Sequence, residues 1–192
     1  MKQTNTNAPQ TLYISNRKDW RKWLENNFSN KKEIWLIYPH KNSGNPRIVY
    51  NDAVEEALCF GWIDSTIKTF DEHSSMQRFT PRNPKSAYSQ PNKERIKWLL
   101  KNNLLHPSVV AVAKEIQQEK FVFPDDILEA LKADKTVWEN YSRFSDAYKR
   151  IRIAYIDGAR KYPAEFEKRL QNFISKTRNN KQIGFGGIEK YY

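Results

Sequence analysis

The segment RFTPRNPKSAYS, residues 78–89, combines three cations with three Ser and Thr hydroxyls and contains no acidic residue. Such side chains are the donors that surround phosphates and carboxylates in proteins. The segment ends where SQP is expected to begin a helix, whose first backbone amides are free to bind an anion. We therefore predict a small-anion site formed by Arg78, Thr80, Arg82, Lys85, Ser86 and Ser89. The alternative is a connector that Pro81 and Pro84 stiffen and whose cations are solvated.

Asp64 lies in an expected strand that precedes this segment, and residues 71–73 (Asp-Glu-His) form the turn after it. Carboxylate and imidazole groups can act as general acids or bases. The many cations in the next strand favour a structural role for Asp64, either in an ion pair with Arg78 or Arg82 or as an acceptor for backbone amides. We expect Asp64 to be structural.

The remaining reactive side chains form no recognisable catalytic pattern. Cys59 is the single cysteine, which excludes an intrachain disulfide, and we expect it to be a buried thiol without a catalytic role. The three histidines are widely spaced, and neither a metal-ligand motif nor a Gly-rich phosphate loop is present. We therefore expect no metal and no cofactor, and binding is a better prediction than catalysis.

The net charge of +11 is concentrated in two segments. Residues 78–101 carry seven cations and one acid (7 − 1 = +6), and residues 143–181 carry eleven cations and four acids (11 − 4 = +7). Lysines 93, 97 and 101 share one face of an expected helix, and the second segment interleaves tyrosines with arginines from Tyr148 to Lys161. Non-specific binding of nucleic acid is therefore an alternative function, while solvated helix faces explain the same pattern more simply.

The elements that position these residues differ between the two halves of the chain. Strand-type segments such as EIWLIYPH alternate with helical patterns up to residue 90, whereas helical periodicity continues from Pro91. We predict an α+β fold with a domain at residues 10–90, a helical domain at 91–180 and a flexible tail at 181–192. The first domain should contain a small, mostly antiparallel sheet with helices, and the helical half should pack against it.

The length and aromatic content of the chain are sufficient for a sizeable core, with six Trp, ten Tyr and ten Phe among 192 residues. No stretch approaches the roughly 18 to 20 apolar residues that a membrane helix needs, and the polar start MKQTNTNAPQ lacks the features of a signal peptide. We therefore expect a cytoplasmic protein that does not insert into membranes.

Three segments carry a resemblance to a known family: EALCFGWIDS at residues 56–65, RFTPRNPKSAYSQPNKERI at 78–96, and the helical half from FVFPDDILEAL to RLQNFISKTRNNKQIGFGG. Together they resemble the YdeI/OmpD-associated family, also described as bacteriocin-protection proteins. The resemblance implies an α+β part followed by a helical part. It implies a structural motif at Gly61, Trp62 and Asp64, and it adds Asn92 to the residues expected to bind the ligand. It implies no particular reaction.

The sequence therefore favours a stress-protective binding protein that recognises a small anionic ligand or an acidic protein surface through its basic loop. A nucleic-acid-binding accessory protein and an enzyme of unidentified reaction are the alternatives. The ligand and the oligomeric state do not follow from the residues.

Overall fold

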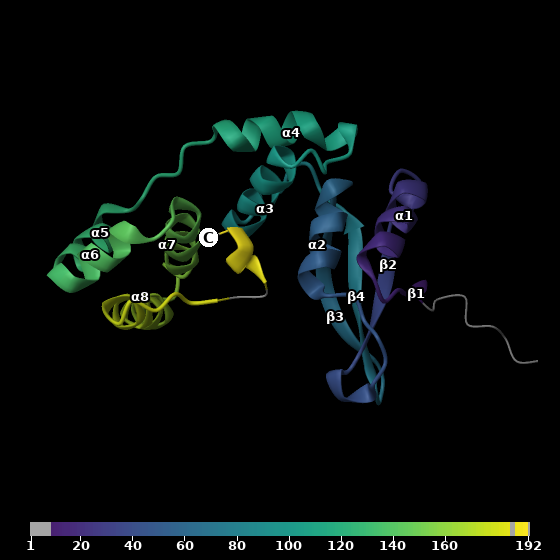
Figure 1. Cartoon of the computed structure of the whole chain (residues 1–192), viewed down its shortest axis with the longest axis horizontal. Coiled ribbons are helices and arrows are strands. Elements are labelled where there is room, and N and C mark those ends of the chain that lie inside the picture. The colour runs from purple at the N-terminus through teal and green to yellow at the C-terminus, as the bar shows by residue number, and fades with distance from the viewer. Residues whose placement is uncertain (1–8, 185–186, 192) are drawn as a thin grey trace, which may run out of the picture. The chain divides into compact units, whose positions relative to one another are not determined.

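The computed structural model describes residues 9–184 and 187–191, and these form two compact units (Figure 1). Unit 1 contains residues 9–87 and 99–113, and unit 2 contains residues 88–98 together with the described residues from 114 onward. Helices α3 (Gln90–Lys101) and α4 (Pro107–Gln118) contribute residues to both units. The two units are therefore interleaved along the chain, whereas the sequence predicts one boundary between the two domains, after residue 90.

A four-stranded sheet organises unit 1, with the strand order β1-β2-β4-β3. Its strands are β1 (Thr11–Tyr13), β2 (Ile34–Pro39), β3 (Trp62–Asp71) and β4 (Ser74–Pro81). The pairs β2–β4 and β3–β4 are antiparallel, but β1 runs parallel to β2. The sheet is therefore mixed, and the prediction of a mostly antiparallel sheet is wrong. The cause is helix α1, which connects β1 to β2. It carries the chain back to the end of the sheet where β1 begins, so β2 can run in the same direction as β1.

Helices α1 (Arg17–Asn27) and α2 (Tyr50–Cys59) lie beside this sheet (Figure 1). Aromatic side chains make much of the contact between them. The fully buried ring of Trp20 lies 5.3 Å from that of Phe79 on β4, and its indole nitrogen donates to the carbonyl of Ala53 on α2 at 3.0 Å. Trp23 meets Trp62 edge to face, with 5.9 Å between ring centroids. These contacts bury large apolar areas and give unit 1 its core.

The ends of these elements follow local sequence signals. Asn16 caps α1, because its side-chain oxygen accepts from the backbone amide of Asp19 at 3.0 Å. Gly61 follows α2 with a φ of +71°, a left-handed conformation that glycine adopts without steric cost, and the chain turns there into β3. A short 3₁₀ helix, Lys41–Ser43, joins β2 to the segment before α2.

Unit 2 is built from helices. Besides its parts of α3 and α4, it contains α5 (Asp125–Lys132), α6 (Lys135–Arg143), α7 (Asp146–Asp157) and α8 (Pro163–Arg178). Ser145 caps α7, because its hydroxyl accepts from the amide of Tyr148 at 3.2 Å. The core joins all four of the later helices, with Leu131, Tyr141, Tyr148 and Phe173 among its members. All residues from 91 to 175 are described, and none of them lies in a strand.

The expected flexible tail, residues 181–192, falls partly on residues 185, 186 and 192, which lie outside the described residues. Within the described part, Ile188–Tyr191 forms a 3₁₀ helix in which Ile188 and Tyr191 are buried against Ile151 and Trp98. This short helix is therefore part of the packed structure of unit 2. None of the described helices is long and apolar enough to cross a membrane.

Candidate functional site

Arg78, the first cation of the predicted anion site, lies on β4 and forms an ion pair with Glu33. Its Nε lies 2.8 Å from a carboxylate oxygen of Glu33, next to the start of β2. This hydrogen bond is the main reason why the pKa of Glu33 is lowered from its ordinary value. The guanidinium is thus oriented by an internal partner, and an external anion has to compete with Glu33 for it.

The loop after β4 is closed by its own hydrogen bonds. The guanidinium of Arg82 donates to the carbonyl oxygens of Asn83, at 3.3 Å, and of Ser86. The side-chain oxygen of Asn83 accepts from the backbone amide of Lys85 at 2.9 Å. Lys85 and Ser86 are exposed, and Thr80 is half-buried on β4. The guanidinium of Arg82, which was expected to face an anion, therefore donates to two backbone carbonyls.

Ser89 and Asn92 belong to unit 2, whereas the other five predicted ligand-binding residues belong to unit 1. The carbonyl of Ser89 accepts from the amide of Lys93 at 2.9 Å at the start of α3. The side-chain oxygen of Asn92 accepts from Arg95 at 2.9 Å. Ser89 also lines a pocket of unit 2, which is described below.

The predicted structural motif lies in unit 1, where Trp62 is buried and Gly61 and Asp64 are half-buried. Oδ2 of Asp64 accepts from the hydroxyl of Tyr50 at 2.8 Å and from Nε2 of Gln77 at 2.7 Å. The partners of Asp64 are thus neutral donors and not the arginines that the sequence suggested. The indole of Trp62 donates to the carbonyl of Phe28 at 3.0 Å.

The two sequence motifs that carry the family resemblance meet in unit 1. The carbonyl of Gly61 accepts from the amide of Arg82 at 2.8 Å, and Trp62 pairs with Pro81 in the sheet. The motifs are therefore neighbours because β3 and β4 are adjacent antiparallel strands.

Tyr38 is a buried titratable group near Asp64. Its hydroxyl has no hydrogen-bond partner among the described residues, and the side chain is 8% exposed. Burial, together with the charge of Asp64, raises the pKa of Tyr38 well above its usual value. The hydroxyl therefore stays protonated at neutral pH.

The other candidates for chemistry have structural surroundings. Cys59 is buried, as predicted, and burial raises the pKa of its thiol to about 12, so a nucleophilic thiolate is not available at neutral pH. Asp71 accepts from the hydroxyl of Ser74 and from the backbone amide of His73, which lowers its pKa and orders the turn between β3 and β4. No group of three or more His, Cys, Asp or Glu side chains within the described ranges is placed to hold a metal.

The aromatic and basic residues that suggested nucleic-acid binding do not form one exposed surface. Tyr148 is fully buried and Arg152 is 7% exposed. Arg150 forms a two-pronged ion pair with Glu94, at 2.7 and 2.9 Å. These three positions face the interior or an acidic partner, whereas Tyr155, Arg160 and Lys161 of the same pattern are exposed.

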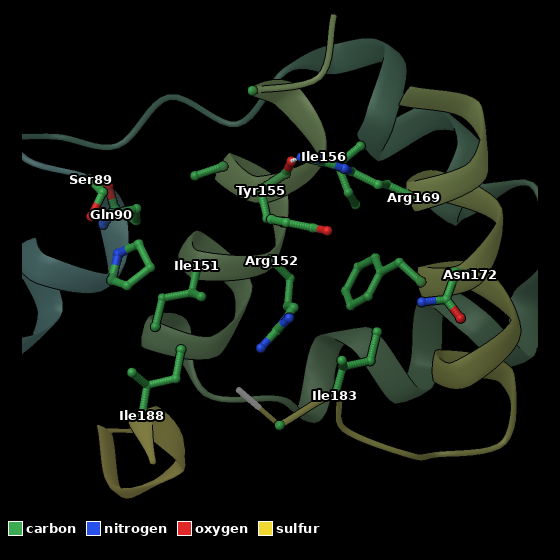
Figure 2. Close-up of a pocket in the computed structure, with 15 residues that line it drawn as sticks. Ser89, Gln90, Ile151, Arg152, Tyr155, Ile156, Arg169, Asn172, Ile183 and Ile188 are labelled. Carbon is green, nitrogen blue, oxygen red and sulfur yellow. Dashed lines mark hydrogen bonds between the residues drawn. The ribbon is translucent and has the colours of Figure 1, made fainter. Parts of the chain in front are cut away.

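Unit 2 contains a pocket of about 530 Å³ between α7, α8, the start of α3 and the C-terminal segment (Figure 2). This volume lies within the range of about 300 to 1,000 Å³ that small-molecule sites occupy. The residues that line it are Ser89, Gln90, Pro91, Ile151, Arg152, Ala154, Tyr155, Ile156, Gly158, Arg169, Asn172, Phe173, Ile183, Gly184 and Ile188.

The walls of the pocket are mostly apolar, with a few polar groups. Ile151, Ile156, Phe173 and Ile188 are each at most 2% exposed. Figure 2 shows the side chain of Arg152 extending from α7, with Ile151 on one side and Ile183 on the other. None of the described lining residues is acidic.

Arg169 is the second cation of the lining. It donates from Nε to Glu165 at 2.8 Å and from Nη1 to the carbonyl of Tyr155 at 2.8 Å, and it stacks 3.9 Å above the Tyr155 ring. Its guanidinium is therefore held on the surfaces of α7 and α8 by three contacts. Arg152, in contrast, is the more buried of the two arginines.

Sequence reasoning did not select Arg152, Arg169 or Asn172 as site residues. A signal for Arg152 is nevertheless present, because it falls four residues after Tyr148 and four before Ile156, on the face of α7 that both residues bury. A charged residue on the apolar face of a helix is unusual and marks a position to test for function.

Comparison with protein families gives two matches. Residues 12–112 match a family described as a domain of unknown function (DUF8412). Residues 120–180 match the family described as bacteriocin-protection, YdeI or OmpD-associated, and this range contains α5 to α8. No curated protein and no solved structure matches the chain.

Proposed function

Since the chain belongs to the family of the domain of unknown function (DUF8412) and its residues 120–180 carry a domain of the bacteriocin-protection family, we propose that it is a binding protein. In this proposal a small organic anion occupies the pocket of unit 2, next to Arg152. The observation that carries the proposal is a pocket of about 530 Å³ with mostly apolar walls, whose described lining includes two arginines, Arg152 and Arg169. A protective role, which the family description suggests, then rests on capture of that ligand.

The lining favours binding over catalysis. Its described residues include two hydroxyl side chains, Ser89 and Tyr155, but no His, Cys, Asp, Glu or Lys. Acyl or phosphoryl transfer to a hydroxyl requires a base to accept its proton, and these five residue types are the usual bases and alternative nucleophiles. Reversible binding needs only the pocket and its polar contacts.

Ligand titration by calorimetry tests this proposal. The probes are benzoate, octanoate, inorganic phosphate and AMP, each added to the full chain. A ligand of about 10 heavy atoms, the size of octanoate or benzoate, at ~0.3 kcal/mol per atom binds with about 3 kcal/mol, which corresponds to a Kd of about 6 mM. We expect at least one of the organic anions to bind in this range.

Two matched variants locate the binding. Ala154 lines the pocket, so Ala154→Leu adds three carbons to the pocket wall and should abolish binding. Ala147 lies on the same helix but not in the lining, and Ala147→Leu should bind as the parent does. If the parent binds none of the probes, or if Ala154→Leu binds as tightly as the parent, the proposal is wrong.

A further inference from the structure

The C-terminal 3₁₀ helix, Ile188–Tyr191, supplies part of the wall of the pocket in unit 2. Ile188 lines the pocket and is fully buried, and Figure 2 shows it beside Ile151 of α7, which lines the pocket too. The same two isoleucines form a buried apolar cluster with Tyr191, and Trp98 packs against this cluster. The contacts that hold the C-terminal helix in place are therefore partly made by residues that a ligand would touch.

The C-terminal helix is docked through side chains. The ring of Tyr191 meets that of Trp98 edge to face, with 5.9 Å between centroids, and the ammonium group of Lys190 lies 4.3 Å from the centre of the Trp98 ring. Two of the four helix residues, Ile188 and Tyr191, are buried. Ordering a segment costs conformational entropy at every residue, and the burial of two side chains offsets a cost of similar size. Docking of the C-terminal helix is therefore expected to be reversible.

The residues just before the C-terminal helix are held separately. The backbone amide of Ile183 donates to the hydroxyl of Tyr148 at 2.9 Å, and the Ile183 side chain packs against the core of α5 to α8. The C-terminal helix can therefore leave α3 and α7 while Ile183 stays in the pocket wall. Such a release would remove Ile188 from the pocket and would expose Ile151 and Trp98 to water.

Docking also brings a charge to the edge of the pocket. The carboxylate of Glu189 lies against Gly184, which lines the pocket, and a carboxylate there opposes an anionic ligand. Glu189 is exposed, so water screens its charge, whereas Ile188 is fully buried and its contact with a ligand excludes water. The apolar wall therefore outweighs the charge, and docking favours the bound ligand.

From these contacts we propose that the C-terminal helix regulates the pocket, because binding of a ligand and docking of the helix stabilise each other. This proposal rests on the proposed function and adds a control element to the same site. The docked helix completes the pocket wall, so a ligand binds the docked state more tightly than the undocked state. By thermodynamic linkage, the ligand shifts the helix toward the docked state by the same factor. Release of the helix therefore weakens retention of the ligand.

Hydrogen exchange measured by mass spectrometry tests one direction of this coupling. The backbone amides of residues 188–191 can exchange whenever the C-terminal helix undocks. We expect a saturating concentration of benzoate, octanoate or AMP, whichever binds, to slow this exchange in the parent at least about threefold. The amides of β1, Thr11–Tyr13, belong to unit 1 and should exchange at an unchanged rate.

Tyr191→Ala tests the other direction, because Tyr191 anchors the C-terminal helix and does not line the pocket. If about a third of the variant molecules keep the helix docked, the apparent Kd rises about threefold, since affinity falls with the fraction of the competent state. We expect a rise of at least this size. Tyr191→Phe keeps the ring that meets Trp98 and should bind nearly as the parent does. Tyr162 is 70% exposed and lies outside the lining, so Tyr162→Ala is the matched control and should leave binding unchanged.

The outcomes separate this proposal from the proposed function. If a probe binds, Ala154→Leu abolishes that binding and Tyr191→Ala binds as tightly as the parent, the pocket is a ligand site but the C-terminal helix does not control it. If the bound probe leaves the exchange of residues 188–191 unchanged, the coupling is also wrong, and this measurement on the parent decides even if Tyr191→Ala does not fold. If no probe binds the parent, both this proposal and the proposed function are wrong.

Discussion

Replacement of Asp64 by alanine should destabilise the protein through the loss of two hydrogen bonds. The carboxylate of Asp64 accepts from Tyr50 at 2.8 Å and from Gln77 at 2.7 Å, and both donors meet the same oxygen atom. The two donors differ in exposure, because Gln77 is 5% exposed and Tyr50 is 38% exposed. In the variant, Tyr50 can donate to water, whereas the amide of Gln77 is left buried without its acceptor.

The magnitude follows from this difference. A buried donor that loses its acceptor costs about 1 to 3 kcal/mol, and an exposed hydroxyl that turns to water costs about 0.5 to 1 kcal/mol. We therefore expect Asp64→Ala to lower the free energy of unfolding by about 2 to 4 kcal/mol. Asp64→Asn keeps an oxygen acceptor but loses its charge, and charge-assisted bonds are roughly twice as strong as neutral ones, so a loss of about 1 to 2 kcal/mol is expected.

Urea denaturation followed by tryptophan fluorescence and circular dichroism measures these free energies. Glu72 is exposed in the turn after β3, and Glu72→Ala removes a carboxylate there with an expected change of no more than about 0.5 kcal/mol. The reasoning is refuted if Asp64→Ala is as stable as Glu72→Ala. A variant of full stability that lost ligand binding would instead assign Asp64 to a functional site.

Two further predictions concern the ion pair between Arg78 and Glu33 and the turn at Gly61, which leads into β3. Because Arg78 lowers the pKa of Glu33 from 4.5, the stabilisation by this pair is present above about pH 4.5 and is lost as the pH falls through the lowered pKa. The stability difference between the parent and Glu33→Gln should therefore shrink in urea titrations as the pH falls below 4.5, and a difference that does not change with pH contradicts the assignment. Gly61→Ala should cost about 1 to 2 kcal/mol, because φ is +71° and the new Cβ meets Val109 only at 3.6 Å, an ordinary contact. Gly44 has a φ of +72°, and nothing lies within 4 Å of a Cβ added there, so Gly44→Ala should lose a similar free energy of unfolding in the same assay. A much larger loss for Gly61→Ala than for Gly44→Ala would show that packing, and not backbone strain, causes the loss at Gly61.

Local patterns in the sequence predicted the run of helices after Pro91. The Asn16 and Ser145 caps and the turn at Gly61 likewise depend on residues within a few positions of one another. Such short-range interactions hold in whichever fold the chain adopts. The parallel pairing of β1 with β2 was not predicted, because strand direction depends on where the intervening helix packs.

The sequence by itself determined the α+β composition, the buried state of the single cysteine and the family of the helical half. Only the tertiary structure decided which charged residues are available to a ligand. Arg78 is joined to Glu33 from 45 positions earlier in the chain, and Arg150 to Glu94 from 56 positions earlier. Arg152 lies on the apolar face of α7, but only the packing of α7 against distant elements places it in a pocket wall. The physical reason is that the partner of a charge is set by the packing of distant elements, which the neighbouring residues in the sequence do not specify.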